Sequence, residues 1–270
     1  MNALPIGVFD SGIGGLSVLR ALRQVLPYEH FIYFADTARL PYGDKTPQQL
    51  ISYCQETVYW MQQTVGVKMI IAACHTSSTI ALPAISNTLP CPIIGMLDIP
   101  LSVLGRATHL GVLATQATIN SQMYTHFFRT LGFQGQVQEI ACPMIVPCLE
   151  NQTPEDLLSF LQIYLRPFWT ETFDTLFYGC THYPLIDQMI QSLLPQHVSC
   201  IDPADFLAKK VQDYLTVHAL LHPQKQQTEV SFYCSGPPQL FQKNVMQWGQ
   251  MTTSQVHQID LPIPCGGVVV

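Results

Sequence analysis

The sequence predicts an α/β fold of two pseudo-symmetric lobes, each a mostly parallel sheet flanked by helices, with the active site in the cleft between them. Short apolar runs, several of them rich in β-branched or aromatic residues, recur along the chain and end in Gly, Pro, Asp or Ser-Thr clusters. Helical stretches lie between these runs, and such alternation is typical of a largely parallel sheet. The second half of the chain also repeats the layout of the first. The expected strands are Ile6–Phe9, Phe31–Phe34, Lys68–Ala73, Ile93–Leu97, Leu110–Ala114, Gln136–Ile140, Thr175–Tyr178 and Val198–Ile201.

The connections between strands are expected to be helices and tight turns. Helices are predicted over Pro47–Val65 and Thr153–Trp169. In the second of these, a proline and two acids come early, as a helix N-terminus prefers. The glycines of Ser11–Gly15 lack the spacing of a phosphate-binding loop, so they predict a tight turn from a strand into a helix.

The two halves resemble each other in the order of their motifs. Ile6–Ser11 and Leu110–Thr115 are both apolar runs that end in a hydroxyl side chain, and a later strand in each half ends at a cysteine, Cys74 or Cys180. Two similar lobes facing each other would explain this pattern. We expect residues 1–98 and 206–270 to form the first lobe and residues 99–205 to form the second.

The composition limits the kinds of partner that the chain can have. Hydrophobic residues make up 48% of the 270 residues and charged residues only 11%, which excludes disorder. The formal net charge is -6, and no basic run is longer than Lys209-Lys210. A nucleic-acid partner requires a basic face, so we expect none.

The sequence also predicts neither membrane insertion nor secretion. The longest stretch without Asp, Glu, Lys or Arg, Met69–Leu97, is interrupted by prolines and polar residues, which a lipid-spanning helix does not tolerate. The N-terminal segment MNALPIGVFD has no basic region followed by an apolar one, so no signal peptide is expected. The chain has nine cysteines, an odd number, and reduced thiols in the cytoplasm fit this count better than a set of disulfides.

Two cysteines stand where chemistry is expected. Cys74 and Cys180 both follow a predicted strand and precede a predicted helix. In open α/β sheets, ligands bind beyond the carboxyl ends of the strands, and a helix N-terminus stabilises a thiolate. If the lobes face each other, the two thiols meet one cleft from opposite sides. Such a pair could remove a proton from one face of a carbon and return one to the other face.

The chain resembles the glutamate racemases, cofactor-independent members of the aspartate/glutamate racemase superfamily, over nearly its whole length. The similarity is carried by short motifs whose order and spacing together are specific. These motifs are Ile6–Leu16, Ala35–Gly43, Ala73–Thr76, Gly111–Thr115, Cys142-Pro143 with Val146-Pro147, and Tyr178–Ile186.

The resemblance implies a role for each matching residue. Cys74 and Cys180 match the two acid/base thiols, the first serving the D-enantiomer and the second the L-enantiomer. The supporting polar residues matched in the family are Asp10, His182 and Glu150. The residues matched to substrate contacts are Asp10, Ser11, Tyr42, Gly43, His75, Thr76, Thr181 and His182, with Thr115 and Thr118 as additional contacts. The family uses no metal, flavin or pyridoxal phosphate, and its members often form homodimers.

The main departure from the family pattern is at position 75, and a smaller one is Pro203, where relatives more often carry Ser. Relatives usually carry Asn after the first cysteine, where its amide touches the substrate, and this chain has His75. An imidazole is bulkier and can become cationic near neutral pH. It could still hydrogen-bond the ligand, or it could change the pH profile, the substrate or the activity.

Four alternatives remain open from the residues themselves. The side chains of Cys74, His75, Cys180 and His182 could bind zinc, although adjacent residues at a strand end tend to point apart. A Cys-His hydrolase would explain one cysteine and one histidine but not the second cysteine. The chain could also be a racemase for aspartate or another amino acid, or a non-catalytic binding protein on the same scaffold.

Overall fold

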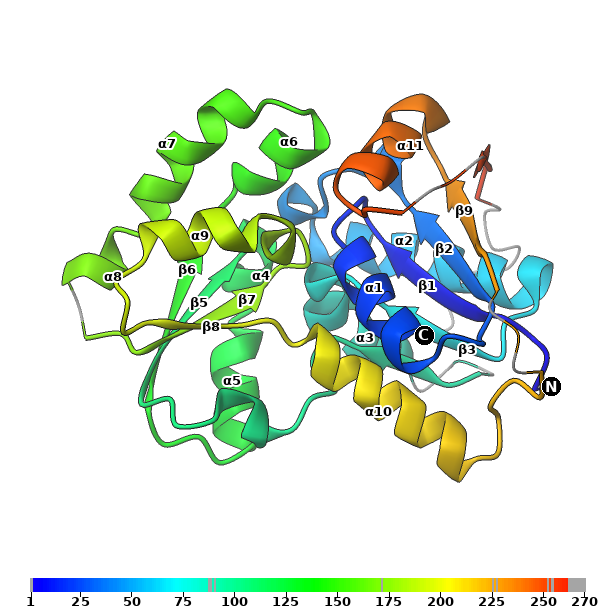
Figure 1. Ribbon diagram of the computed structural model, residues 1–270, viewed down its shortest axis with the longest axis horizontal. Coiled ribbons are helices and arrows are strands. Elements are labelled where there is room, and N and C mark those ends of the chain that lie inside the picture. Colours follow the sequence, from blue (N-terminus) through cyan, green and yellow to red (C-terminus); the bar gives the residue numbers. More distant parts are fainter. Residues whose placement is uncertain are drawn as a thin grey trace.

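The computed structural model describes residues 2–86, 89, 91–170, 172–224, 226, 228–251, 253 and 255–261. Within these residues the chain forms two parallel sheets, each flanked by helices, which lie side by side (Figure 1). The predicted α/β class with two mostly parallel sheets is confirmed. Cys265 and the last part of the range 206–270 lie outside the described residues.

The first sheet has six strands in the order β10-β9-β2-β1-β3-β4. Its central strand β1 is buried along its whole length, and each pair in the sheet is parallel. Helices cover both faces of such a sheet, which explains why the inner strands β1, β2 and β3 are buried along their whole length. The strands are β1 (Ile6–Asp10), β2 (Phe31–Ala35), β3 (Met69–Ala72), β4 (Ile93–Gly95), β9 (Val230–Cys234) and β10 (Val256–Gln258).

The second sheet has four parallel strands in the order β6-β5-β7-β8. All eight predicted strands are present across the two sheets, with ends that differ by at most two residues. The strands β9 and β10 were not predicted individually; they bring the last part of the chain back to the first sheet. The strands of the second sheet are β5 (His109–Ala114), β6 (Gln136–Ala141), β7 (Thr175–Gly179) and β8 (Ser199–Ile201). The residue limits proposed for the two lobes remain a prediction.

The two predicted helices are present, but the last part of each differs from a regular α-helix. The helix α2 (Pro47–Trp60) begins with a capping box between Thr46 and Gln49 and continues as a π-helical turn over Met61–Val65. The helix expected over residues 153–169 is divided into α7 (Pro154–Tyr164) and α8 (Pro167–Thr170). Proline has no amide hydrogen and its ring clashes with the preceding turn, so Pro167 begins a new helix rather than continuing the old one.

The remaining helices join and cover the sheets. Helix α1 packs against α10, which comes after the last strand of the second sheet, and α11 lies near α6 at the top of Figure 1. Among the described residues, no helix is long and apolar enough to span a membrane. These helices are α1 (Leu16–Val25), α3 (Leu82–Ile85), α4 (Gln116–Asn120), α5 (Met123–Thr130), α6 (Ile145–Glu150), α9 (Asp187–Leu193), α10 (Ala204–Val217) and α11 (Pro238–Gln247).

Candidate active site

The strand registers bring the predicted site residues together. In the first sheet Phe9 pairs with Ala72, so Asp10 and Cys74 leave the sheet at the same edge. In the second sheet Ala114 pairs with Gly179, which places Thr115 and Cys180 at a common edge in the same way. One small cavity between the two edges is lined by Asp10, Ser11, Tyr42, Gly43, Cys74, His75, Thr76, Thr115, Val146, Cys180, Thr181 and His182.

Eleven of the thirteen predicted site residues line this cavity, and two lie directly behind it. Glu150 hydrogen-bonds His182, and Thr118 hydrogen-bonds two of the lining threonines. Val146, which was not predicted as a site residue, completes the lining. The cavity measures only about 10 Å³, room for roughly one water molecule. The lining must therefore separate before an amino acid can enter.

Asp10 lies at the end of β1 and organises the turn that follows. Its carboxylate accepts hydrogen bonds from the amides of Ser11, at 2.6 Å, and Gly15. The hydroxyl of Thr181, from the second half, donates to the same carboxylate at 3.2 Å. Burial raises the pKa of Asp10, although the charge of His182 opposes this rise. Asp10 thus connects the two halves at the cavity that it lines.

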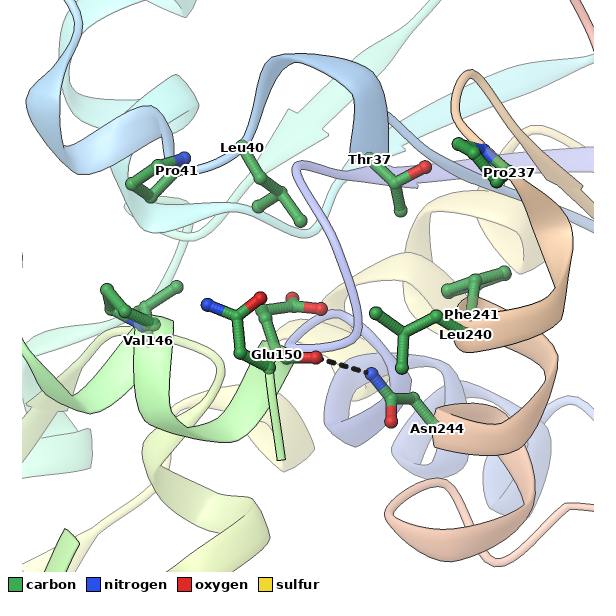
Figure 2. A pocket seen from close by; sticks show the side chains of 11 residues that line it. Thr37, Leu40, Pro41, Val146, Glu150, Pro237, Leu240, Phe241 and Asn244 are labelled. Atoms are coloured by element: carbon green, nitrogen blue, oxygen red, sulfur yellow. Dashed lines mark hydrogen bonds between the residues drawn. The ribbon is translucent and has the colours of Figure 1, made fainter. Parts of the chain in front are cut away.

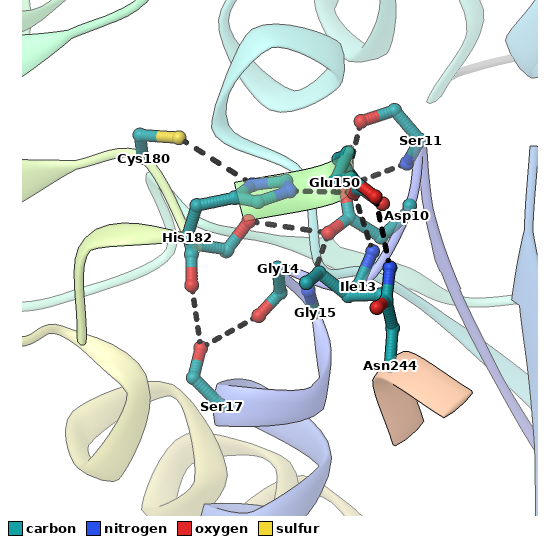
Figure 3. Close-up of polar contacts among 12 residues, drawn as sticks. Asp10, Ser11, Ile13, Gly14, Gly15, Ser17, Glu150, Cys180, His182 and Asn244 are labelled. Carbon is teal, nitrogen blue, oxygen red and sulfur yellow. Dashed lines mark hydrogen bonds and ion pairs between the residues drawn. The ribbon is translucent and has the colours of Figure 1, made fainter. Parts of the chain in front are cut away.

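A chain of polar contacts leads from Glu150 to one of the two thiols (Figure 3). Glu150 Oε1 lies 2.7 Å from His182 Nε2, and His182 Nδ1 lies 3.8 Å from the Sγ atom of Cys180. Burial disfavours the imidazolium, but the hydrogen bonds to Cys180 and Glu150 outweigh it and raise the pKa of His182 well above its ordinary value. A cationic His182 is the partner that a thiolate on Cys180 requires.

Two other contacts hold Glu150 in place. The amide of Ile13 donates to Glu150 Oε1 at 2.8 Å, and the side-chain amide of Asn244 donates to the Glu150 backbone carbonyl at 3.1 Å (Figure 3). Asn244 lies on α11, far along the sequence from the motifs, and no pattern in the sequence pointed to it.

The glycine-rich segment is a turn between β1 and α1, as predicted, and its glycines allow close approach. A Cβ atom on Gly12 would overlap the carboxylate of Glu150, and one on Gly14 would overlap His182 and Thr181. The turn therefore lies against the polar side chains of the second half, where a larger residue would not fit.

Cys74 has a different environment from Cys180. Burial and the nearby Asp10 carboxylate raise the pKa of Cys74 well above its ordinary value, while hydrogen bonds with Ser77 act in the opposite direction. The helical turn that supplies Ser77 begins at His75, directly after the thiol, as expected. After Cys180 a turn and a 3-10 helix over Tyr183–Ile186 come first, so the predicted adjacent α-helix begins only with α9.

Hydroxyl groups line the wall between the halves. Thr76 lies 2.9 Å from Thr115 and 3.2 Å from Thr118, and the latter two are 3.0 Å apart, all measured between hydroxyl oxygens. Thr118 is completely buried and hydrogen-bonds the other two threonines, which line the cavity. The prediction of Thr118 as a substrate contact stays a prediction.

The loop with Tyr42 and Gly43 closes the cavity from above the first sheet. The phenol of Tyr42 donates to Asp36 Oδ2 at 2.5 Å, and burial raises the pKa of Tyr42 well above its ordinary value. Gly43 lies so close to Thr115 that an added Cβ atom would be 2.9 Å from the threonine Cβ. The Tyr42 hydroxyl is thus engaged by Asp36, while Tyr42 and Gly43 both line the cavity.

His75 is buried, with 2% of its surface exposed, and burial lowers its pKa to about 3. The expectation that this imidazole could become cationic near neutral pH is therefore wrong, because no nearby acid offsets the loss of water. Its Nδ1 atom contacts the phenol oxygen of Tyr124, a residue of α5 that the sequence analysis did not single out.

The candidate zinc ligands do not form a metal site. Among the described residues, no group of three or more His, Cys, Asp or Glu side chains is arranged to hold a metal ion. The two histidines use their nitrogens in other ways, since His75 Nδ1 contacts Tyr124 and His182 Nε2 contacts Glu150.

A second cavity of about 340 Å³ lies on the other side of Glu150 (Figure 2). It is formed between the loop after β2, helix α6 and helix α11. Leu40, Val146, Leu240 and Phe241 give it an apolar wall, and Glu150 is its charged residue. Val146 lines both cavities, and Glu150 lines the second one and hydrogen-bonds His182, which lines the first.

Comparison with known proteins agrees with this fold. Residues 6–211 match the sequence profile of the family described as Asp/Glu/Hydantoin racemase. The glutamate racemase of Picosynechococcus is 41% identical over 95% of this chain and 92% of its own length, and that of Gloeobacter violaceus is 39% identical over 90% and 91%. The crystal structure of glutamate racemase from Francisella tularensis in complex with D-glutamate superposes with a TM-score of 0.88, at 31% identity, over 97% of this chain and 99% of that one.

The fold and the paired thiols thus define an amino-acid racemase, an isomerase. The chain belongs to the Asp/Glu/hydantoin racemase family and, within it, to the glutamate racemases.

Proposed function

We propose that the chain interconverts L-glutamate and D-glutamate by a two-thiol mechanism without a cofactor. The observation that carries the proposal is that Cys74 and Cys180 line one cavity, each from the carboxyl edge of a different sheet. A bound amino acid between them would present opposite faces of its α-carbon to the two sulfur atoms.

The surroundings of the thiols support a division of roles. In the direction from L to D, Cys180 as thiolate takes the α-proton, and the cationic His182 at 3.8 Å balances its charge beforehand. Cys74 as thiol donates a proton to the opposite face, and its raised pKa keeps that proton in place until it is needed. The step leaves Cys180 protonated and Cys74 as thiolate, which is the state that begins the reverse reaction.

The carbanion formed between the two steps requires stabilisation where its charge develops. The hydroxyls of Ser11, Thr76 and Thr181 line the cavity, and they support binding of the substrate carboxylate and amine. Closure of the lining around a bound substrate would exclude water, which strengthens these interactions.

The substrate assignment rests on the relatives, which are glutamate racemases. Glutamate racemization implies supply of D-glutamate for bacterial peptidoglycan. We also propose that the protein acts in the cytoplasm, where that supply is needed, and that it can form a homodimer, as members of the family often do.

The experiment that tests this proposal is a chiral assay of L-glutamate and L-aspartate with the purified protein and no added cofactor. We expect D-glutamate to accumulate until the enantiomers are equal, and aspartate to react much more slowly. A preference for aspartate would make the chain a racemase of that amino acid. Binding of glutamate without any turnover would favour a non-catalytic scaffold, and an acyl group trapped on Cys180 would favour a hydrolase.

A further inference from the structure

His75 and Tyr124 form a contact between the two halves at the edge of the cavity. His75 follows Cys74 and lines the cavity, while Tyr124 lies on α5 (Met123–Thr130) behind the second sheet. We propose that Tyr124 is a positioning residue that holds His75 in the tautomer with its proton on Nε2, so that this N–H donates a hydrogen bond to the bound amino acid. This inference rests on the proposed function only for the identity of the ligand.

The phenol of Tyr124 has one acceptor within reach. Its ring is completely buried and packs against Phe128 and Phe177, with centroid distances of 5.8 and 5.3 Å. Among the described residues, His75 Nδ1 is the single hydrogen-bond partner of the phenol oxygen. Burial also raises the pKa of Tyr124 well above its ordinary value, so the phenol keeps its proton. An O–H group buried among aromatic rings would lose a hydrogen bond if it pointed elsewhere.

The hydrogen bond donated by the Tyr124 phenol then determines which ring nitrogen of His75 carries the proton. A neutral imidazole carries one N–H, and its other nitrogen is an acceptor. If Nδ1 accepts from the phenol, the proton of the ring is on Nε2. Within the described part of the chain Nε2 makes no hydrogen bond to protein, although the ring lines the cavity. Nε2–H is therefore available to a ligand there.

A donor at this position fits an amino-acid ligand. The carboxylate of an amino acid accepts hydrogen bonds and cannot donate them. Relatives usually carry the amide of Asn at this position, which also offers an N–H. Without Tyr124 the neutral ring of His75 could place its proton on either nitrogen, and one of the two tautomers would turn a lone pair toward the carboxylate.

The tautomer can be observed directly by nitrogen NMR on protein labelled with ¹⁵N-histidine, using His75→Asn to assign the signal of His75. We expect an acceptor-type shift for Nδ1 and a protonated shift for Nε2, and a change in the Nε2 shift when D-glutamate is added. Tyr124→Phe should shift both signals toward a mixture of tautomers. A proton on Nδ1 in the unmodified protein, or an Nε2 signal that does not respond to D-glutamate, would overturn the inference.

Tyr214→Phe is a matched control. Tyr214 lies on α10 and also stacks against a histidine, His218, with ring centroids 4.0 Å apart. Its hydroxyl makes no hydrogen bond to any described residue, so its loss should leave the signals of His75 unchanged.

A double-mutant cycle tests the same idea through turnover. Tyr124→Phe should raise the KM for glutamate about tenfold, with a smaller effect on kcat, since about 1.4 kcal/mol of binding is lost. In the His75→Asn background the same change should alter KM by less than roughly twofold, because an amide has no tautomer to set. Equal effects of Tyr124→Phe in both backgrounds would show a packing role and overturn the inference.

The two experiments separate this inference from the proposed function. The NMR measurement on the free protein reports the tautomer whether or not the protein turns over glutamate. A protein that shows the Nε2–H tautomer but racemises no amino acid would refute the proposed function and leave the role of Tyr124 in place.

Discussion

Replacement of Glu150 by Gln removes one charge from the polar chain that ends at Cys180. Glu150 is 7% exposed and His182 is 2% exposed, so water does not screen their contact. A glutamine has the same shape and can still accept the hydrogen bond from Ile13 that Glu150 Oε1 accepts at 2.8 Å. The fold should therefore persist, and His182 keeps an oxygen acceptor at this position but loses the negative charge that balances its imidazolium.

The size of the effect follows from the change of a charged hydrogen bond into a neutral one. A hydrogen bond to a charged group is worth ~1.5–3 kcal/mol and a neutral one ~0.5–1.5 kcal/mol, so a loss of about 1–1.4 kcal/mol should lower kcat/KM about five- to tenfold. The fall must be equal for L-glutamate and D-glutamate, because the two enantiomers have the same free energy. The pKa of His182 should decrease, since its hydrogen bond to Glu150 is one of the causes that raise it.

The same variant should show a pH-dependent loss of stability. The pKa of His182 is raised by folding, so its charged form stabilises the protein fully below the unfolded pKa of about 6.5 and loses this effect as pH rises through the folded value. The difference in Tm between the unmodified protein and Glu150→Gln should therefore be greatest near pH 6 and decrease at alkaline pH.

Chiral assays in both directions and thermal melts over a pH series measure these effects. Glu229→Gln, the same change at an exposed position just before β9, is the control and should alter neither kcat/KM nor Tm. If Glu150→Gln keeps the kcat/KM and the pH profile of the unmodified protein, the charge of Glu150 does not act through His182.

Three further outcomes are expected. Cys74→Ala and Cys180→Ala should each abolish racemization, measured by chiral chromatography, while the circular dichroism spectrum stays native. Cys91→Ala, outside the cavity, is the control and should remain active. Turnover in either site variant would exclude that thiol from the mechanism. In deuterium oxide the product enantiomer should carry deuterium at its α-carbon by mass spectrometry, and product that keeps its original hydrogen would contradict exchange through the thiols. Gly12→Ala should lower kcat/KM more than tenfold in the chiral assay, because the new methyl group overlaps the Glu150 carboxylate and distorts a preorganised site. Normal activity would show that the turn can move away from Glu150.

Most of the fold could be predicted because its signals are local. Each buried strand is a short apolar run with a polar end, and the order of strands and helices indicates parallel sheets. The strands β9 and β10 lacked this signal. β9 is only partly buried, and β10 has three residues, two of them exposed, so both are held by pairing with the strand next to them rather than by their own sequence.

The candidate site was predictable where residues follow strand ends in order, as Asp10, Cys74 and Cys180 do. The sequence does not show how deeply a side chain is buried or whether it lines a cavity, so Thr118 could not be distinguished from the threonines that line it. Asn244 and Tyr124 could not have been found in this way, because each lies on a helix and reaches the site only through tertiary packing.

The pairing of β2 with β9 has a consequence for biosynthesis. Phe31 pairs with Val230, so the first sheet contains neighbours from distant parts of the chain. The strands of the second sheet, from β5 to β8, are contiguous in sequence. On a ribosome, which releases the chain from its N-terminus, all four strands of the second sheet emerge before β9. The second sheet can therefore form while β2 is still unpaired on the side where β9 binds. Until β9 emerges, the edge of β2 presents unpaired backbone groups to other nascent chains.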